Sequence, residues 1–134
     1  MDMNTVKELF KRDRYAAHSG IELLEVTPGG ARARMKLQPF HFNGLGTAHG
    51  GAIFTLADFV FAAACNSHGT VAVAVNASIS IMKATTAGTL LAEAREVSKN
   101  FKLGNYTVEI KDEAGEIIAL FHGLAYRKKD PLPV

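Results

Sequence analysis

The chain has 134 residues, of which 48% are apolar and 21% charged, a composition typical of one globular domain with a sizeable core. Its 15 basic and 13 acidic side chains nearly balance, which argues against a nucleic-acid or membrane-surface partner. The single cysteine, Cys65, excludes an internal disulfide, and the charged N-terminal segment starts no signal-peptide core, so we expect a cytoplasmic protein.

The N-terminal part of the chain predicts a helix and a hairpin. Thr5 and Glu8 fit a capping box, and apolar residues follow at helical spacing, so a helix is expected over residues 5–18. Two strand-like segments, 21–27 and 31–37, flank a Pro-Gly-Gly turn, and the second segment alternates charged with apolar residues. The hairpin should therefore have one face in water.

An apolar helix is predicted in the middle of the chain. A Gly-rich loop leads into residues 50–66, which are apolar nearly all round and show no alternation of period two. This helix should be buried on all sides, and it is too short to be a membrane span. Asp58 lies within it and is the only Asp, Glu, Lys or Arg between Lys36 and Lys83.

A long strand is predicted after this helix. Between residues 71 and 81 the side chains alternate, and the pattern places Ala74, Asn76 and Ser78 on one face with the valines and isoleucines on the other. Three further strands are expected, over 89–98, 103–111 and 116–127. The last two should be joined by a tight turn, and the final residues should form a loose end.

The order of these elements predicts one α+β domain over residues 1–134. Consecutive strands with short connections favour an antiparallel sheet, and the apolar helix is the element that such a sheet can wrap. Strand edges and helix surface left exposed in one chain favour a homo-oligomer.

The entry of the central helix suits acyl transfer. If His49 precedes the first turn, the amides of Gly50 and Gly51 have no acceptor within the helix and carry the positive end of its dipole. Such amides can stabilise a developing oxyanion, and glycine has no Cβ to hold a ligand carbonyl away from the backbone. We therefore assign the oxyanion to the amide of Gly50, with Gly51 close by.

Asp58 cannot form a catalytic pair with His49 of the same chain. Nine positions separate them, which is about half a turn out of phase and roughly 13 Å along the helix axis. If two such helices pack antiparallel across a two-fold axis, Asp58 of one chain comes near Asn43, His49 and Gly50 of the other. The competing interpretation is a structural carboxylate bonded to backbone amides or to a hydroxyl such as that of Thr55.

Residues 43–51 read NGLGTAHGG, and Leu56-Ala57-Asp58 and Ala64-Cys65-Asn66-Ser67 follow. These motifs resemble the acyl-CoA thioesterases of the hotdog fold, and most closely the branch named after the phenylacetate-degradation thioesterase. The resemblance implies hydrolysis of an aryl- or acyl-CoA thioester to the free acid and CoA, at sites shared across a homodimer interface. It also implies a long central helix wrapped by a curved sheet, a dimer of dimers, and CoA as part of the substrate with no metal or other cofactor.

The motif suggests a role for each polar residue. Asp58 is expected to act as general base for a water or as direct nucleophile, and the sequence leaves both mechanisms open. Asn43 is a candidate for holding the water or the thioester oxygen, and His49 for orienting the loop or bonding the carbonyl. Some relatives place a hydroxyl residue near Ala74, which Asn76 or Ser78 is expected to replace from the same strand face.

The acyl group and the nucleotide of such a substrate need different surroundings. Phe54 and other aromatic side chains near Asp58 favour an apolar acyl or aryl pocket. Four cations on or between the later strands are candidate contacts for the CoA phosphates, although a solvated polar face explains each of them equally well. These cations are Lys83, Arg95, Lys99 and Lys102.

Other functions remain as alternatives. A non-catalytic acyl-CoA-sensing module is the main competing interpretation, and a hydratase acting on acyl-CoA is a third. A metal site is not expected, because His41, His68 and His122 have no other ligands at metal-binding spacing. Cys65 is assigned to the core.

Overall fold

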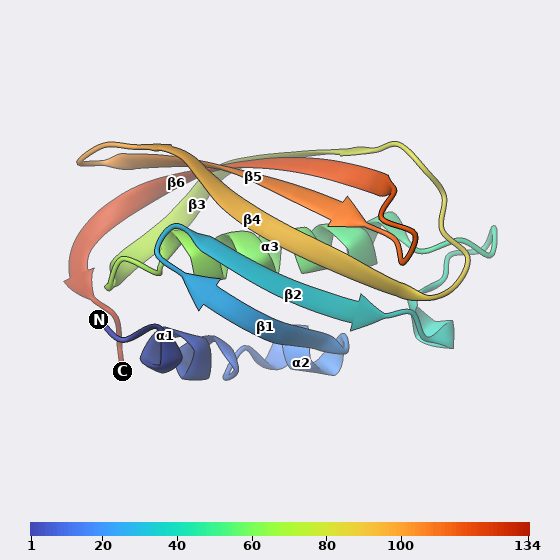
Figure 1. The fold of residues 1–134 in the computed structure, drawn as a ribbon, viewed down its shortest axis with the longest axis horizontal. Coiled ribbons are helices and arrows are strands. Elements are labelled where there is room, and N and C mark those ends of the chain that lie inside the picture. Colours follow the sequence, from blue (N-terminus) through green and yellow to red (C-terminus); the bar gives the residue numbers. More distant parts are fainter.

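The structure is a computed structural model that describes residues 1–134, and Figure 1 shows a curved sheet with a long helix packed against it. The helices are α1 (Met3–Phe10), α2 (Arg14–His18) and α3 (Gly50–Cys65), with a 3₁₀ turn, η1, at Pro39–His41. The strands are β1 (Ile21–Thr27), β2 (Gly30–Lys36), β3 (Thr70–Ile81), β4 (Thr89–Lys99), β5 (Leu103–Lys111) and β6 (Ile117–Pro131). The predicted α+β class, the central helix and all six strands are confirmed.

The N-terminal segment contains two short helices rather than the single helix predicted over residues 5–18. α1 begins after Asp2, whose carboxylate accepts the N–H of Asn4 at 3.1 Å. Asp13 caps α2 in the same manner. The capping box predicted at Thr5 is therefore wrong, because an aspartate three residues earlier already caps the helix. Both helices lie on the β1 side of the molecule (Figure 1).

All six strands form one antiparallel sheet in the order β1-β2-β4-β5-β6-β3, and α3 contacts every strand of it. Gly123 on β6 permits the close approach of helix and sheet, because a Cβ at this position would lie 2.6 Å from a ring carbon of Phe61. The β1–β2 hairpin has one face turned away from α3, where Arg32 and Arg34 of β2 form ion pairs with glutamates of β1. The prediction of a hairpin with one face in water is confirmed.

None of the helices is long and apolar enough to cross a bilayer.

β3 does not alternate regularly along its length. Ala74 pairs with Ala125, but the next pair is Asn76 with Leu124, so β3 contains one extra residue in a β-bulge. Because cross-strand partners share a face, Ala74 lies on the inner face with the buried Ala125, whereas Asn76 and Ser78 lie on the outer face. The common face predicted for these three residues is wrong, since the bulge shifts the alternation by one.

The C-terminal tail is part of the fold rather than a loose end. β6 continues to Pro131, which pairs with Thr70, and the N–H of Leu132 donates to the carbonyl of Gly69 at 3.2 Å. The Leu132 side chain is only 6% exposed. Burial of this apolar side chain fixes the tail against the start of β3.

One side of α3 is not covered by the sheet. Its residues are exposed or half-buried and recur at helical spacing, and we call them the α3 stripe: Gly51, Phe54, Thr55, Asp58 and Ala62. β3 is an edge strand, and residues 73–78 are exposed on both of its faces. The prediction that the central helix is buried on all sides is therefore wrong for the single chain. The α3 stripe and the β3 edge are the surfaces left uncovered.

Candidate active site

The first turn of α3 has one amide without an acceptor. His49 is the N-cap, and its ring Nδ1 accepts the N–H of Gly51 at 2.8 Å. The His49 carbonyl accepts the N–H groups of Ala52 and Ile53 at 2.9 and 3.1 Å. The N–H of Gly50 makes no hydrogen bond within the chain. The N–H of Gly50 is thus free to donate to a ligand. The N–H of Gly51, which was predicted to lie close to the oxyanion, is instead bonded to the His49 ring.

A second histidine holds this helix entry in place. His41 is buried, and its carbonyl accepts the N–H of His49 at 2.7 Å. The His41 ring accepts the Gln38 N–H at 2.9 Å and donates from Nε2 to the Ser19 carbonyl at 2.6 Å. The loop before α3 is therefore fixed to α2 through one side chain. Sequence reasoning assigned His41 to structure, but the position of its ring could not be foreseen from spacing.

The polar side-chain atoms of Asn43 form hydrogen bonds within its own loop. Its Oδ1 accepts the N–H groups of Leu45 and Thr47 at 2.9 and 3.1 Å, and its Nδ2 donates to the Thr47 hydroxyl at 3.0 Å. This is the pattern of a turn-forming asparagine. In the single chain Asn43 therefore shapes the approach to Gly50 rather than presenting a free group to a substrate.

Asp58 lies at the middle of the α3 stripe without a partner. No hydrogen bond or ion pair of the chain involves its carboxylate, which is half-buried. The Thr55 hydroxyl donates instead to the Gly51 carbonyl at 2.7 Å, so the structural role considered for Asp58 has no support. Burial, and then the nearby charge of Asp13, raise the pKa of Asp58. A half-buried carboxylate with a raised pKa is suited to accept a proton.

The aromatic residues near Asp58 have different surroundings. Phe54, on the α3 stripe, is half-buried and packs edge-to-face against Phe121 with ring centroids 5.6 Å apart. Phe59 and Phe61 are buried in the core. Among these three phenylalanines, Phe54 alone lies on the α3 stripe with Asp58. Burial raises the pKa of Cys65 to about 12, so this thiol is not a nucleophile at neutral pH.

The four cations predicted to contact phosphates do not form one group. Lys83 lies beside the β5–β6 turn, where its ammonium pairs with Asp112 at 3.1 Å and Glu116 at 2.7 Å. Arg95 lines a cleft of about 400 Å³ between the β1–β2 hairpin and β4. Lys99 ends β4, and Lys102 belongs to the β4–β5 turn. The structure does not gather the four cations into one cluster, and their contacts with the CoA phosphates stay predictions.

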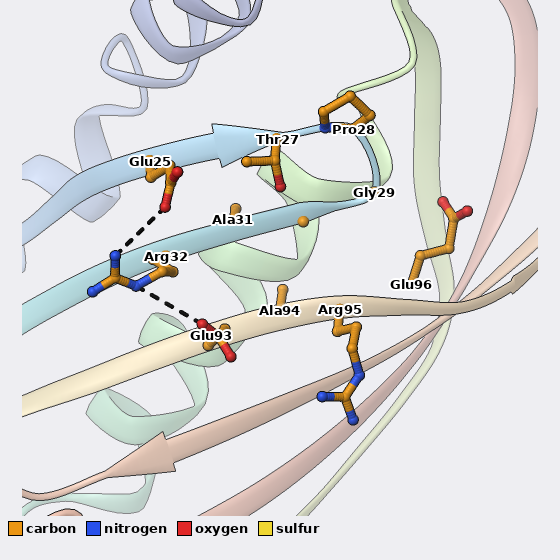
Figure 2. A pocket seen from close by; sticks show the side chains of 11 residues that line it. Glu25, Thr27, Pro28, Gly29, Ala31, Arg32, Glu93, Ala94, Arg95 and Glu96 are labelled. Carbon is orange, nitrogen blue, oxygen red and sulfur yellow. Dashed lines mark hydrogen bonds and ion pairs between the residues drawn. The ribbon is translucent and has the colours of Figure 1, made fainter.

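The cleft at the β1–β2 hairpin lies apart from the candidate catalytic groups. Figure 2 shows Arg32 between Glu25 and Glu93, at 3.5 and 3.8 Å, with Arg95 pointing away from these ion pairs. Arg32 and both of its glutamate partners are exposed, and ion pairs between such side chains contribute little to stability. Neither Gly50 nor Asp58 lines this cleft.

A polar cluster that sequence reasoning missed lies where α3 ends. The Glu96 carboxylate accepts hydrogen bonds from His68 and from the hydroxyl of the buried Tyr106, each at 2.7 Å. Burial alone would raise the pKa of Glu96, but these hydrogen bonds and the charge of His68 hold it below its ordinary value. The three residues are far apart in sequence, so no motif signals them. The cluster joins α3 to β4 and β5.

A family model and two known proteins match most of this chain or more than half of it. A family model described as the thioesterase superfamily matches residues 45–119. A protein of Archaeoglobus fulgidus is 40% identical over 126 residues, which are 93% of this chain and 82% of that protein. The acyl-coenzyme A thioesterase PaaI of Escherichia coli is 35% identical over 120 residues, which are 89% of this chain and 86% of PaaI.

Solved structures agree in fold. The structure of E. coli PaaI, from the phenylacetic acid degradation operon, has a TM-score of 0.89 at 34% identity and covers 92% of this chain and 91% of its own. Zebrafish thioesterase superfamily member 2 has a TM-score of 0.84 at 28% identity, covering 96% and 99%.

The wrapped helix and six-stranded sheet are those of the hotdog fold, as the resemblance implied. The matched segment contains both Gly50 and Asp58. The chain belongs to the thioesterase superfamily, as a PaaI-like thioester hydrolase.

Proposed function

We propose that the protein hydrolyses aryl- or acyl-CoA thioesters at sites formed between two copies of the chain. One observation carries the proposal: the Gly50 N–H and the Asp58 carboxylate are both unpartnered, yet they lie eight positions apart on the helix, which is roughly 12 Å along its axis. An oxyanion donor and a carboxylate are what thioester hydrolysis requires, and one chain cannot bring them to the same carbonyl. The description of the E. coli relative as an acyl-coenzyme A thioesterase supports the substrate class.

The uncovered surfaces suit a two-fold dimer. The largely exposed stretch of β3, residues 73–81, is centred on Ala77. A two-fold axis at this residue would pair the two β3 strands antiparallel, make the two sheets continuous, and lay the α3 stripes against each other. In this arrangement Asp58 of one chain faces Gly50 of the partner subunit.

The proposed reaction uses each group once. The thioester carbonyl accepts the N–H of Gly50 of the partner subunit, and the α3 dipole stabilises the negative charge that develops on the oxygen. Asp58 takes a proton from a water whose oxygen attacks the carbonyl carbon, or its own oxygen attacks and water then cleaves the anhydride. The C–S bond breaks, and CoA leaves as a thiolate whose thiol has a pKa near 8.5, so a strong acid is not needed.

Phe54 supports an apolar acyl or aryl group in the substrate, because its half-buried ring lies one helical turn from Asp58. A dimer of dimers is proposed from the family resemblance together with apolar side chains, such as Leu120 on the outer sheet face, that stay exposed in the single chain. Light scattering on the purified protein tests that assembly: a mass of two chains would exclude it.

Thiol release from a panel of phenylacetyl, hydroxybenzoyl and aliphatic CoA thioesters tests the function. We expect turnover by the wild type and a loss of at least about 100-fold in Asp58→Asn. A wild type that binds these esters and cleaves none would make the protein an acyl-CoA sensor. Cleavage by Asp58→Asn at the wild-type rate would remove Asp58 from the mechanism.

A further inference from the structure

His41 is a buried polar side chain that the proposed reaction does not use. It is the last residue of η1, and it is only 2% exposed. Both of its ring nitrogens have partners, since Nδ1 accepts the N–H of Gln38 and Nε2 donates to the carbonyl of Ser19. This pair of bonds holds the ring in one neutral tautomer. A ring with no free nitrogen makes no hydrogen bond to a substrate, so an effect of His41 on a reaction passes through another group.

The imidazole ring also packs against its neighbours. The Phe40 ring lies beside it, with centroids 4.1 Å apart. Gly20 lies close to it as well, because a Cβ at this position would be 3.8 Å from the ring carbon Cε1. The ring therefore loses packing contacts and two hydrogen bonds if it changes rotamer.

The backbone of His41 is bonded next to the start of α3. A short antiparallel bridge joins Phe42 to Ala48. Beside this bridge, the N–H of His49 donates to the His41 carbonyl at 2.7 Å. His49 is the N-cap of α3, and Gly50 follows it directly. The bonded amide of His49 and the free amide of Gly50 thus belong to consecutive residues.

The ring of His41 ties this helix entry to the N-terminal part of the chain. Residues 38–49 lead into α3, and the bond from His41 to Ser19 is their only side-chain hydrogen bond to a part of the chain outside this segment and α3. Ser19 is the C-cap of α2. Without the ring, the segment keeps its own turns and loses its fixed distance from α2.

We propose that His41 is a positioning residue for thioester hydrolysis, whose ring, bonded to Ser19, holds the N–H of Gly50 in the orientation that receives the oxyanion. The role rests on the proposed function, because the oxyanion donor is assigned there. Such a donor acts in the transition state and contributes most when the protein fixes it in advance at about 3 Å from the oxygen. A small displacement of the helix entry therefore lowers the rate of the chemical step rather than the affinity for substrate.

A double-mutant cycle between His41 and Gly50 tests this role. His41→Phe keeps an aromatic ring and loses both hydrogen bonds, and we expect kcat for acyl-CoA hydrolysis to fall about tenfold while KM changes less than about twofold. In the Gly50→Pro background, which has no donor to position, the same substitution should lower kcat less than about twofold. An equal fall in both backgrounds, or a rise in KM without a fall in kcat, overturns the proposal.

Val26→Ala is the matched control for lost stability. Val26 is buried in β1 beside the hairpin turn, and this turn contacts the far end of α3, where the N–H of Gly29 donates to the Ser67 hydroxyl. The control variant should lower the melting temperature, as His41→Phe does, and leave kcat unchanged. A fall in kcat equal to that of His41→Phe would show that lost stability explains the effect, and it would overturn the proposal.

Amide hydrogen exchange tests the same role without a substrate. We expect the N–H of His49 to exchange about tenfold faster in His41→Phe than in the wild type. The N–H of Asn66 at the other end of α3, which donates to the Ala62 carbonyl, should keep its rate. An unchanged rate at His49, or an equal increase at both amides, overturns the proposal. If no thioester is cleaved, the proposed function fails, yet the exchange rates still decide whether the ring holds the helix entry.

His41→Asn serves in the same measurements if His41→Phe does not fold. Its Oδ1 can accept the N–H of Gln38 as Nδ1 does, so that only the bond to Ser19 is lost. We expect the same loss of kcat and the same faster exchange at His49. Wild-type kcat together with wild-type exchange in this variant overturns the proposal.

Discussion

At the scale of single residues, the proposed reaction assigns the chemistry to the unpaired groups of α3, while the paired groups fix the shape of the loop and of the first turn. Asp58 and the Gly50 N–H have no partner, whereas Asn43 and His49 have theirs within the loop and the first turn. The sequence alone identified Asp58 as a candidate functional residue, because it is the one charged residue in a long apolar stretch. The bonds of Asn43 and Gly51 depend on side-chain rotamers and loop shape, which spacing in the sequence does not encode.

The environment of Asp58 opposes stability, although it suits the proton transfer proposed for this carboxylate. Its raised pKa means that the folded chain holds the protonated form more tightly than the unfolded chain, so ionisation above that pKa costs stability. We expect Asp58→Asn to increase the free energy of unfolding at neutral pH by up to about 1 kcal/mol, while thioesterase activity is lost. Chemical denaturation at pH 7 and pH 4 measures this. A variant that is less stable than the wild type at neutral pH would show that the carboxylate has a structural partner.

Two variants of His49 separate capping from catalysis. His49→Ala removes the acceptor of the Gly51 N–H and should lower the free energy of unfolding by about 1 kcal/mol. His49→Asn restores an N-cap and should recover both stability and thiol release. If His49→Asn is as stable as the wild type but inactive, the imidazole contacts the substrate, and capping does not explain the role of His49 in activity.

Gly50 offers a test of the oxyanion donor. Its N–H is unpaired and it is the first residue of α3, while His49 before it is extended, with φ −63° and ψ 134°. Proline is favoured at such a position, so Gly50→Pro should fold normally and lose the donor. We expect thiol release to fall about 100- to 1,000-fold, with little change in melting temperature. Gly50→Ala keeps the N–H as a control. Equal activity in the two variants would exclude Gly50 as the donor.

At the scale of elements, sequence patterns predicted what local chemistry dictates. The hairpin turn, the alternating strands and the uniformly apolar helix follow from short-range pattern and were found. The second cap, at Asp13, is a local interaction with the N–H of Ala16 that was not foreseen. Two further features follow from pairing with distant segments and were not foreseen: the bulge that turns Asn76 and Ser78 outward, and the docking of Leu132. Each depends on which partner the segment finds in space.

The cluster around Glu96 should stabilise the junction of α3 with the sheet. Because the pKa of Glu96 is lowered in the fold, its contribution is present above the unfolded pKa and is lost as the pH falls through the folded value. We expect Glu96→Gln to lower the free energy of unfolding by about 1–2 kcal/mol at pH 7, and the difference from wild type to shrink below about pH 4. Glu93→Gln, an exposed position 3.8 Å from Arg32, is the control and should cost less than about 0.5 kcal/mol. A pH-independent difference would contradict this account.

At the scale of the whole molecule, a single chain keeps the groups of the proposed site apart. The α3 stripe and β3 edge are uncovered, and the candidate groups on α3 are too far apart to meet on one carbonyl. Helical geometry predicted this separation from the sequence alone, because the distance between two positions on one helix is fixed. The uncovered side of α3 was not predicted, because the helix is apolar nearly all round and its pattern marks no separate face.

Mixing two inactive variants tests the shared site most directly. Equal amounts of Asp58→Asn and Gly50→Pro chains, after subunit exchange confirmed by mass spectrometry, should give heterodimers in which one of the two sites has an intact carboxylate and an intact donor. Random pairing makes half of the dimers mixed, so we expect about a quarter of the wild-type thiol release to return. If exchange is complete and activity stays at the level of the separate variants, the site does not draw on both chains and the account is wrong.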